Sequence, residues 1–266
     1  MEVIGVIPAR YGSTRFEGKI LANIMGKSML QHVWERAKQA TSLDDLIIAC
    51  DNQLVFEVAK EFGANVVFTA KGHMSGTDRI AEVVNPLDIK VVVNIQADEP
   101  LLEPVMIDQL ASSILENKDV YMSTLVKRII SFEEFIDKNV VKVVSDKNGF
   151  ALYFSRSPIP YTSEINTHQN TIYKHLGLYA YTKDFLFTFK NLAVSNLEKT
   201  ERLEQLRALE NGYKIKLVET SIETVGVDTQ EDLEKVTQIT EEKKWLQFVI
   251  SILVRGRDWF LLLVRV

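Results

Sequence analysis

Residues 3–19 read VIGVIPARYGSTRFEGK, and this stretch decides the fold. It joins a short apolar run at 3–8 to a loop that carries glycine, hydroxyl and basic residues. Similar apolar runs follow at 46–50, 65–69 and 91–95. Runs this apolar, bounded by polar residues, are typical of strands buried on both faces of a parallel sheet. The opening run is therefore predicted to be the first strand of such a sheet.

Segments with apolar residues at three- and four-residue spacing come between and after these runs, and this spacing predicts helices. They lie at 29–40, 54–62, 78–84 and 105–115. Alternating strands and helices predict an α/β fold with a doubly wound, mostly parallel sheet. Ligands bind such sheets beyond the carboxyl ends of the strands, so the residues that follow each run are the first candidates for a site.

The pattern changes after Tyr121, where a β-hairpin is predicted. Its strands lie at 140–145 and 150–154, and the turn between them reads DKNG. No linker or repeat divides the chain, so we expect a single domain over 1–242 with this hairpin inserted. The remaining expected elements are a helix at 195–211, a strand at 214–219 and a helix at 228–239.

Residues 243–266 form a tail of unusual composition. Its apolar pieces, WLQFVISILV and WFLLLV, are separated by RGRD. Each piece is shorter than the roughly 20 residues that a membrane span needs, so we expect no stable membrane insertion. The tail is either a segment that binds a membrane surface or a partner, or an element packed against the body of the protein.

Composition excludes several classes of protein. The chain has 266 residues, 31 Lys and Arg, 36 Asp and Glu, and a net charge of −5, which argues against nucleic acid as a partner. Its one cysteine, Cys50, excludes a disulfide framework and lies in an apolar run, where we expect it to be inert. The N-terminal sequence lacks the pattern of a secretory signal, and we expect a cytoplasmic protein.

The loop after the first run combines Gly12 and Gly18 with Arg10, Arg15 and Lys19. Backbone amides exposed by glycine, together with cations, can bind a triphosphate. The loop is neither a Walker loop nor GxGxxG. From its residues alone, an ordinary solvated basic turn is an equally good interpretation.

Carboxylates follow the fourth run and precede the last predicted helix. Asp98 suits Mg²⁺, which prefers one or two carboxylates with phosphate oxygens. The alternative is that Asp98 or Glu99 caps the next helix. Asp228 has the position of a helix N-cap, with Glu231 completing a capping box. Paired with Asp98 around a metal, Asp228 would instead complete a site for phosphoryl transfer.

Two further positions have competing interpretations. Ser75, Thr77 and Arg79 lie in SGTDR, which is either a plain helix start or a segment that recognises a nucleotide base. His175 has no serine or cysteine nucleophile near it in the sequence, which favours a structural role.

Several motifs occur together in this chain. IPARYGSTRFEGK lies at 7–19, SGTDR at 75–79 and NIQADEP at 94–100, and later come VVKVVSDKNGFALYFSRSPIPY, KHLGLYAY, LEQLRAL and GVDTQEDLEKV. Together they resemble the 3-deoxy-manno-octulosonate cytidylyltransferases, the CMP-Kdo synthetases, over about 3–236. The resemblance implies a Rossmann-like nucleotidyltransferase fold, with a dimerisation region around the inserted hairpin.

The resemblance also implies roles for individual residues. Lys19, Asp98 and Asp228 would form the catalytic set, and the two carboxylates would bind Mg²⁺. Arg156 would bind the sugar carboxylate, because a guanidinium fork fits a carboxylate. The implied nucleotide-binding residues are Arg10, Arg15, Lys19, Ser75, Thr77, Arg79 and Gln96. The implied sugar-binding residues are Gln96, Arg156, His175, Tyr179, Glu204 and Gln205.

The implied reaction is Mg²⁺-dependent transfer of CMP from CTP to 3-deoxy-D-manno-octulosonate (Kdo), which activates Kdo for lipopolysaccharide synthesis. The anomeric hydroxyl attacks the α-phosphorus and pyrophosphate leaves, without a covalent enzyme intermediate. A homodimer is expected, with the aromatic-rich region 150–181 as its interface. The alternatives are a cytidylyltransferase for another acid sugar, such as sialic acid or an amino analogue of Kdo, and a catalytically weak nucleotide-binding protein.

The sequence differs from the family pattern at three positions near the implied site. Glu17 and Ile20 stand where the loop usually has proline, and Ala97 stands where glycine is usual. Fewer prolines predict a looser loop, and Glu17 adds a negative charge beside the phosphate site. The methyl group of Ala97 would crowd a close ligand or require a φ that alanine disfavours. All three bear on the affinity for CTP.

Overall fold

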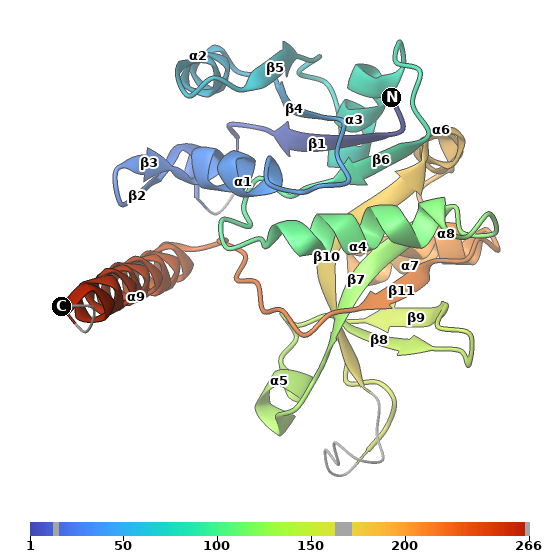
Figure 1. Ribbon diagram of the computed structural model, residues 1–266. Coiled ribbons are helices and arrows are strands. Elements are labelled where there is room, and N and C mark those ends of the chain that lie inside the picture. Colours follow the sequence, from blue (N-terminus) through green and yellow to red (C-terminus); the bar gives the residue numbers. More distant parts are fainter. Residues whose placement is uncertain (13–15, 163–171, 264–266) are drawn as a thin grey trace.

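The opening apolar run forms β1 (Val3–Ala9), which lies inside the main sheet of this computed structural model. The structure describes residues 1–12, 16–162 and 172–263, with side chains described as far as Leu246. The strands follow the order β11-β7-β10-β6-β1-β4-β5 across the sheet (Figure 1). The other strands of this path are β4 (Asp45–Cys50), β5 (Asn65–Phe68), β6 (Val91–Asn94), β7 (Met122–Arg128), β10 (Tyr173–Thr182) and β11 (Lys216–Glu219).

The sheet is mostly parallel, as predicted. β1 pairs in parallel with β4 and β6, β4 pairs in parallel with β5, and β11 pairs in parallel with β7. The exception is β10, which runs antiparallel between β6 and β7. The carboxyl ends of β1, β4 and β6 therefore lie at one edge of the sheet, and the loops that follow them meet there.

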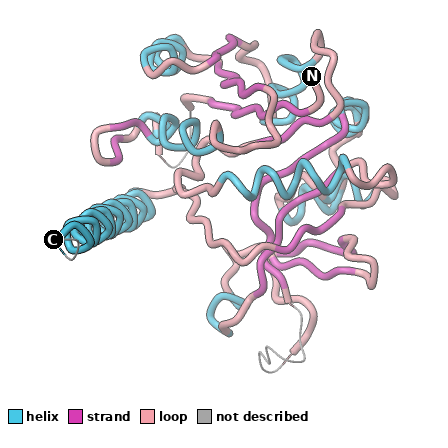
Figure 2. Tube along the Cα trace, in the orientation of Figure 1, coloured by secondary structure: helices cyan, strands magenta, loops and turns pink. Residues whose placement is uncertain are grey.

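Helices cover both faces of the sheet (Figures 1 and 2). Buried side chains of α1, α2 and α4 join one apolar cluster, and those of α3, α6 and α8 join another on the opposite face. β1 contributes to both clusters, which explains why its sequence is apolar at nearly every position. The helices are α1 (Met29–Ala37), α2 (Gln53–Glu61), α3 (Gly76–Val84), α4 (Pro104–Leu115), α5 (Phe132–Ile136), α6 (Lys183–Asn191), α7 (Asn196–Glu201), α8 (Leu206–Glu210) and α9 (Gln230–Leu263).

The predicted hairpin is confirmed as β8 (Lys142–Ser145) and β9 (Ala151–Ser155), which pair in antiparallel fashion. In the turn, Asp146 Oδ1 accepts hydrogen bonds from the backbone N–H groups of Asn148 and Phe150. β8 also pairs with β10, so the hairpin is attached to the main sheet. A second, shorter hairpin is formed by β2 (Asn23–Ile24) and β3 (Lys27–Ser28), and the 3₁₀ turn η1 (Lys19–Leu21) precedes it.

The single helix expected over 195–211 is wrong. The structure has α7 and α8 instead, separated by Arg202, whose φ of 56° lies in the left-handed region. A left-handed residue cannot continue a right-handed helix. The chain turns here, and Leu203 and Leu206 beyond the turn are buried in the core.

The last helix differs from its prediction at both ends. Thr229 Oγ1 accepts from the N–H of Asp232, and Asp232 Oδ2 accepts from the N–H of Thr229. This reciprocal pair caps α9, so the expected capping box of Asp228 and Glu231 is wrong. α9 then continues to Leu263, through the boundary expected at residue 242, and extends away from the sheet (Figure 1).

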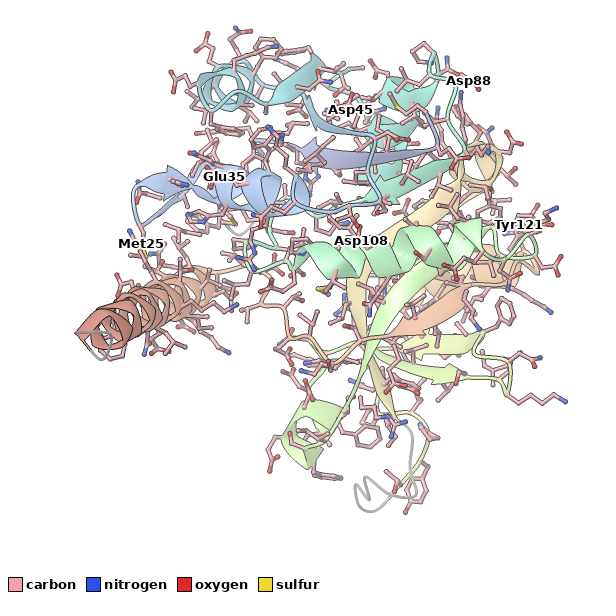
Figure 3. All side chains as sticks on the ribbon, viewed as in Figure 1. Met25, Glu35, Asp45, Asp88, Asp108 and Tyr121 are labelled. Atoms are coloured by element: carbon pink, nitrogen blue, oxygen red, sulfur yellow. The ribbon has the colours of Figure 1, made fainter. Side chains whose placement is uncertain are left out.

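The first turns of α9 pack on the body of the protein. Leu233 and Val236 are buried with Ile24, Met29 and Leu101, beneath the β2–β3 hairpin that carries Met25 (Figure 3). Farther along, Trp245 and Leu246 are exposed. Within the described part of the chain, no helix is both long enough and apolar enough to cross a membrane.

Candidate active site

A triad of charged side chains lies at the edge where the loops after β1 and β6 meet. Lys19 Nζ donates to Asp98 Oδ2 at 2.7 Å and to Asp228 Oδ1 at 2.9 Å. It also donates to the backbone carbonyl of Val227 at 2.9 Å. Burial lowers the pKa of Lys19, but the two carboxylates outweigh this effect and hold the pKa above its ordinary value. Lys19 is therefore a cation fixed between two carboxylates.

The loop after β1 directs Lys19 into this position. Gly18 has a φ of 68°, and its N–H donates to the carbonyl of Tyr11 at 3.1 Å. A Cβ at Gly18 would lie 3.2 Å from the Tyr11 ring, in a backbone conformation that other residues rarely adopt. The glycine thus lets the loop fold back on itself and start η1 with Lys19 as its first residue.

Backbone hydrogen bonding brings the two carboxylates together. The N–H of Val227 donates to the carbonyl of Asp98 at 2.9 Å, which ties the segment before α9 to the end of β6. Asp228 follows Val227 directly, and the Thr229–Asp232 cap leaves its carboxylate directed to Lys19. Neither Asp98 nor Glu99 caps the next helix, because α4 begins after Glu103.

Glu99 differs from its neighbour Asp98 in its environment. Burial, followed by the charge of Asp98, raises the pKa of Glu99 to about 8. At pH 7 this carboxyl is mainly protonated and adds little charge to the site. The negative charge opposite Lys19 therefore comes from Asp98 and Asp228.

The triad lines a cavity of about 320 Å³. Basic and polar side chains from the loops after β1 and β6 and from the start of α3 surround it, as expected for a site that binds a charged ligand. His73 is in the wall although the sequence analysis did not select it; its position two residues before SGTDR was the available signal. The lining residues are Pro8, Arg10, Gly12, Lys19, Ile20, His73, Met74, Ser75, Gly76, Arg79, Gln96, Ala97, Asp98 and Asp228.

The SGTDR segment is a helix start, and its side chains already have partners. Ser75 and Asp78 form the capping box of α3. Arg79 is 3% exposed, donates to Asp51 Oδ2 at 2.7 Å and also contacts Thr69 Oγ1. Thr77 donates to Glu204 Oε2 at 3.2 Å. These contacts hold the wall of the cavity, and the role of Ser75, Thr77 and Arg79 in binding cytosine and ribose stays a prediction.

Most of the expected sugar-binding residues lie on the face of the sheet that α3 and α8 cover. The rings of His175 and Tyr179 lie 5.3 Å apart, and Glu204 reaches Thr77 in the SGTDR segment. Two buried polar atoms, Glu204 Oε1 and Gln205 Nε2, have no hydrogen-bond partner within the described part of the chain. Arg207 Nη2 lies 3.9 Å from Glu204 Oε1. Buried polar atoms usually have a hydrogen-bond partner, so these two have room for a water or another polar group.

Arg156 is not brought into this group. Arg156 follows β9, and its Nε and Nη1 donate to the carbonyls of Glu201 and Lys138 at 2.9 and 3.3 Å. It does not line the cavity of the Lys19 triad. Arg15 lies outside the described residues. The binding roles of both arginines stay predictions.

The positions that differ from the family pattern cause no visible distortion. Outside the glycines, only Met25 and Arg202 have a positive φ within the described part of the chain. Ala97 is therefore not in the backbone conformation that alanine disfavours. Glu17 is exposed and is not among the residues that line the cavity.

Known proteins share both the sequence and the fold. The family model for cytidylyltransferases matches residues 4–216. Over 238 residues the chain is 52% identical to the 3-deoxy-manno-octulosonate cytidylyltransferase of Solibacter usitatus, covering 90% of this chain and 94% of that protein. The chain belongs to this family. The same enzyme of Geotalea uraniireducens is 48% identical over 247 residues, covering 90% of this chain and 98% of that protein.

Solved structures agree with the family assignment. The CMP:2-keto-3-deoxy-manno-octonic acid synthetase complexed with CTP superposes with a TM-score of 0.86 at 38% identity, covering 91% of this chain and all (100%) of that chain. A cytidylyltransferase from Leptospira borgpetersenii, 17% identical with a TM-score of 0.61, shows the same fold. The predicted family and the predicted Rossmann-like fold are both confirmed, and the chain is a nucleotidyltransferase of the cytidylyltransferase family.

The ring of His175, which packs against Phe154 and Tyr179, gives a stability test for this cytidylyltransferase. Burial lowers the pKa of His175 to about 3, while an unfolded histidine titrates near 6.5. Below pH 6.5 the unfolded chain gains a proton that the folded chain does not, so stability falls as the pH falls. Between pH 7 and pH 5 this amounts to about 2 kcal/mol.

We expect His175→Gln, which can keep a hydrogen bond to Thr124, to remove this part of the pH dependence. Urea denaturation at pH 7 and pH 5 should show a change in the free energy of unfolding that is smaller than the wild-type change by about 2 kcal/mol. An equal pH dependence in the two proteins would mean that His175 is not buried as a neutral ring.

Proposed function

We propose that this protein transfers CMP from CTP to 3-deoxy-D-manno-octulosonate, giving CMP-Kdo and pyrophosphate. The observation that carries the proposal is the Lys19–Asp98–Asp228 triad, which lines a cavity with Arg10 and Gln96. The triad lies in a chain that is 38% identical to a synthetase solved with CTP. The curated relatives of the chain carry the name of the same activity. Activation of Kdo for lipopolysaccharide synthesis in the cytoplasm is part of this proposal.

The residues of the triad fit a magnesium ion. Asp98 and Asp228 converge on one cation, the ammonium of Lys19, so their geometry already suits a positive charge. The described residues hold no cluster of three or more acidic, histidine or cysteine side chains able to bind a metal. Two carboxylates are what Mg²⁺ takes from a protein when nucleotide phosphates and water complete its shell. When bound there, the ion supplies charge for the α-phosphate and acidifies the attacking hydroxyl.

The basic residues would bind and orient the triphosphate. Lys19 is charged and already faces the carboxylates, so a small movement would bring Nζ against a phosphate oxygen beside them. Arg10 lines the same cavity from the end of β1. The Pα–O bond to the departing pyrophosphate breaks as the sugar oxygen attacks, and these cations balance the charge that develops on the leaving group. The hydroxyl proton passes to solvent.

The sugar would bind beside the nucleotide, against His175, Tyr179, Glu204 and Gln205. His175 is neutral because burial lowers the pKa of its ring to about 3, so it would orient a hydroxyl and not attract the carboxylate of the sugar. The unpartnered Gln205 Nε2 offers a hydrogen-bond donor in the same region. Thr77, which contacts Glu204, connects this group to the nucleotide side.

Pyrophosphate release tests the proposal directly. We expect release with CTP and Kdo, and much slower release with sialic acid, without sugar, or with ATP, GTP or UTP in place of CTP. Asp98→Asn should lower kcat/KM by about 100-fold or more, because it removes one charge from the proposed metal site. Asp108→Asn is the control, since Asp108 lies on α4 and bonds to Ser42 away from the cavity (Figure 3). Release with sialic acid but not Kdo would favour the alternative acid sugar.

The triad also predicts how the affinity for a divalent metal changes when Lys19 is replaced. Lys19→Met removes the ammonium that donates to both Asp98 and Asp228, so Mn²⁺ should bind this variant more tightly than wild type when CTP is absent. We expect at least a tenfold gain in affinity, about 1.4 kcal/mol, measured from the free Mn²⁺ signal in electron paramagnetic resonance.

A matched control is Lys27→Met, which removes an exposed lysine paired with Glu35. It should bind Mn²⁺ as wild type does. Equal or weaker Mn²⁺ binding by Lys19→Met would show that the ammonium and the metal do not share one position.

A homodimer is also part of the proposal. Large apolar side chains are exposed around the inserted hairpin, where an interface would cover them: Ile130, Phe132, Ile136, Leu152 and Tyr161. Part of the region expected to form the interface, 163–171, lies outside the described residues. Contiguous exposed apolar patches are typical of an interface between subunits, and these five side chains are the candidates for one.

Sedimentation measurements check the homodimer. Leu152→Glu should shift the protein from dimer to monomer at micromolar concentration, because it places a charge in the covered surface. Leu54→Glu, a change at an exposed leucine of α2, should leave the dimer intact. A wild-type protein that sediments as a monomer would contradict the proposal.

A further inference from the structure

Glu201, the last residue of α7, holds the end of β9 through its carboxylate. Its Oε1 accepts from Ser155 Oγ at 2.6 Å and from Tyr153 OH at 3.4 Å. Its Oε2 accepts from the backbone N–H of Arg156 at 2.9 Å. Three donors at the end of β9 therefore converge on the carboxylate of one α7 residue.

The contact continues through the backbone. The carbonyl of Glu201 accepts from Arg156 Nε at 2.9 Å, so the same residue holds Arg156 at its main chain and at its guanidinium. Burial raises the pKa of Glu201, but the hydrogen bonds from Arg156, Ser155 and Tyr153 lower it below its ordinary value. The carboxylate is thus charged, and hydrogen bonds to a charged acceptor are the stronger kind.

Glu201 is also the point at which α7 ends and the chain turns. Arg202 follows with its left-handed φ, and Glu204 and Gln205 come directly after the turn. Each of these two residues carries a buried polar atom that has no hydrogen-bond partner within the described residues. The position of the turn, set at Glu201, therefore determines where both side chains lie.

We propose that Glu201 is a positioning residue for the acid sugar, which fixes Arg156 relative to Glu204 and Gln205. It would not touch the sugar; it would hold together the two segments that do. This inference rests on the proposed function, which assigns the sugar to Glu204 and Gln205, and on the expectation that Arg156 binds the sugar carboxylate. Glu201 lies in neither the cavity of the Lys19 triad nor the set of residues around SGTDR, so the nucleotide should be unaffected.

Glu201→Gln tests the inference with little change of shape. The amide of glutamine places an N–H₂ where the carboxylate accepts, so at least one donor of β9 faces another donor. We expect the KM for Kdo to rise about tenfold or more, while the KM for CTP stays within twofold of wild type. Equal rises in both KM values, or no change in either, would overturn the inference.

Glu210→Gln is the matched control. Glu210 is the last residue of α8 and accepts from the backbone N–H of Leu197 at 2.9 Å, so it also joins α7 to a neighbouring segment, but at the other end of the helix. This variant should keep both wild-type KM values. A selective rise in the KM for Kdo in Glu210→Gln as well would show that any loosening of α7 has the same effect, and would overturn a specific role for Glu201.

Hydrogen exchange gives a readout that does not depend on activity. In Glu201→Gln, amides of 153–157 and of 202–207 should exchange faster together, while those of the Lys19 loop keep their wild-type rates. Should Glu201→Gln fail to fold, Ser155→Ala, which removes one donor, should show the same pattern more weakly. Faster exchange in only one segment would overturn the inference. A wild-type protein without Kdo-dependent pyrophosphate release would instead overturn the proposed function.

Discussion

The ammonium of Lys19 pairs with the carboxylates of Asp98 and Asp228 and offsets the repulsion between them, and the rest of the site is arranged around this interaction. The three residues come from the loop after β1, the end of β6 and the segment before α9. The parallel pairing of β1 with β6 puts the first two at one edge of the sheet, and the hydrogen bond from Val227 to Asp98 brings the third. The site thus depends on a charge balance that the sheet topology makes possible.

That balance explains how one position could serve two cations. An ammonium and a magnesium ion both satisfy a pair of carboxylates, but only the metal also needs phosphate oxygens to complete its shell. A triphosphate that enters the cavity offers those oxygens, and it also offers Lys19 a new partner. On the proposed function, exchange of the ammonium for the metal would accompany nucleotide binding.

The sequence predicts the part of the sheet around β1 better than the part around β10, and the reason is physical. The strands around β1 are buried on both faces, so their composition alone marks them. β10 alternates between buried and half-buried residues over its first half and runs antiparallel, and the sheet order that places it between β6 and β7 has no local signal. The split of 195–211 into two helices depends on the left-handed Arg202, which no residue type at that position announces.

The N-terminal cap of α9 shows the same limit of prediction from local sequence. Asp228 has the spacing of an N-cap, and Thr229 one residue later has it equally. The structure uses Thr229 with Asp232, and Asp228 gains Lys19 as a partner. A shift of one residue decides whether this carboxylate caps a helix or faces Lys19. Capping propensity cannot choose between Asp228 and Thr229. The interaction that distinguishes them is the hydrogen bond from Lys19, which lies 209 positions away along the chain.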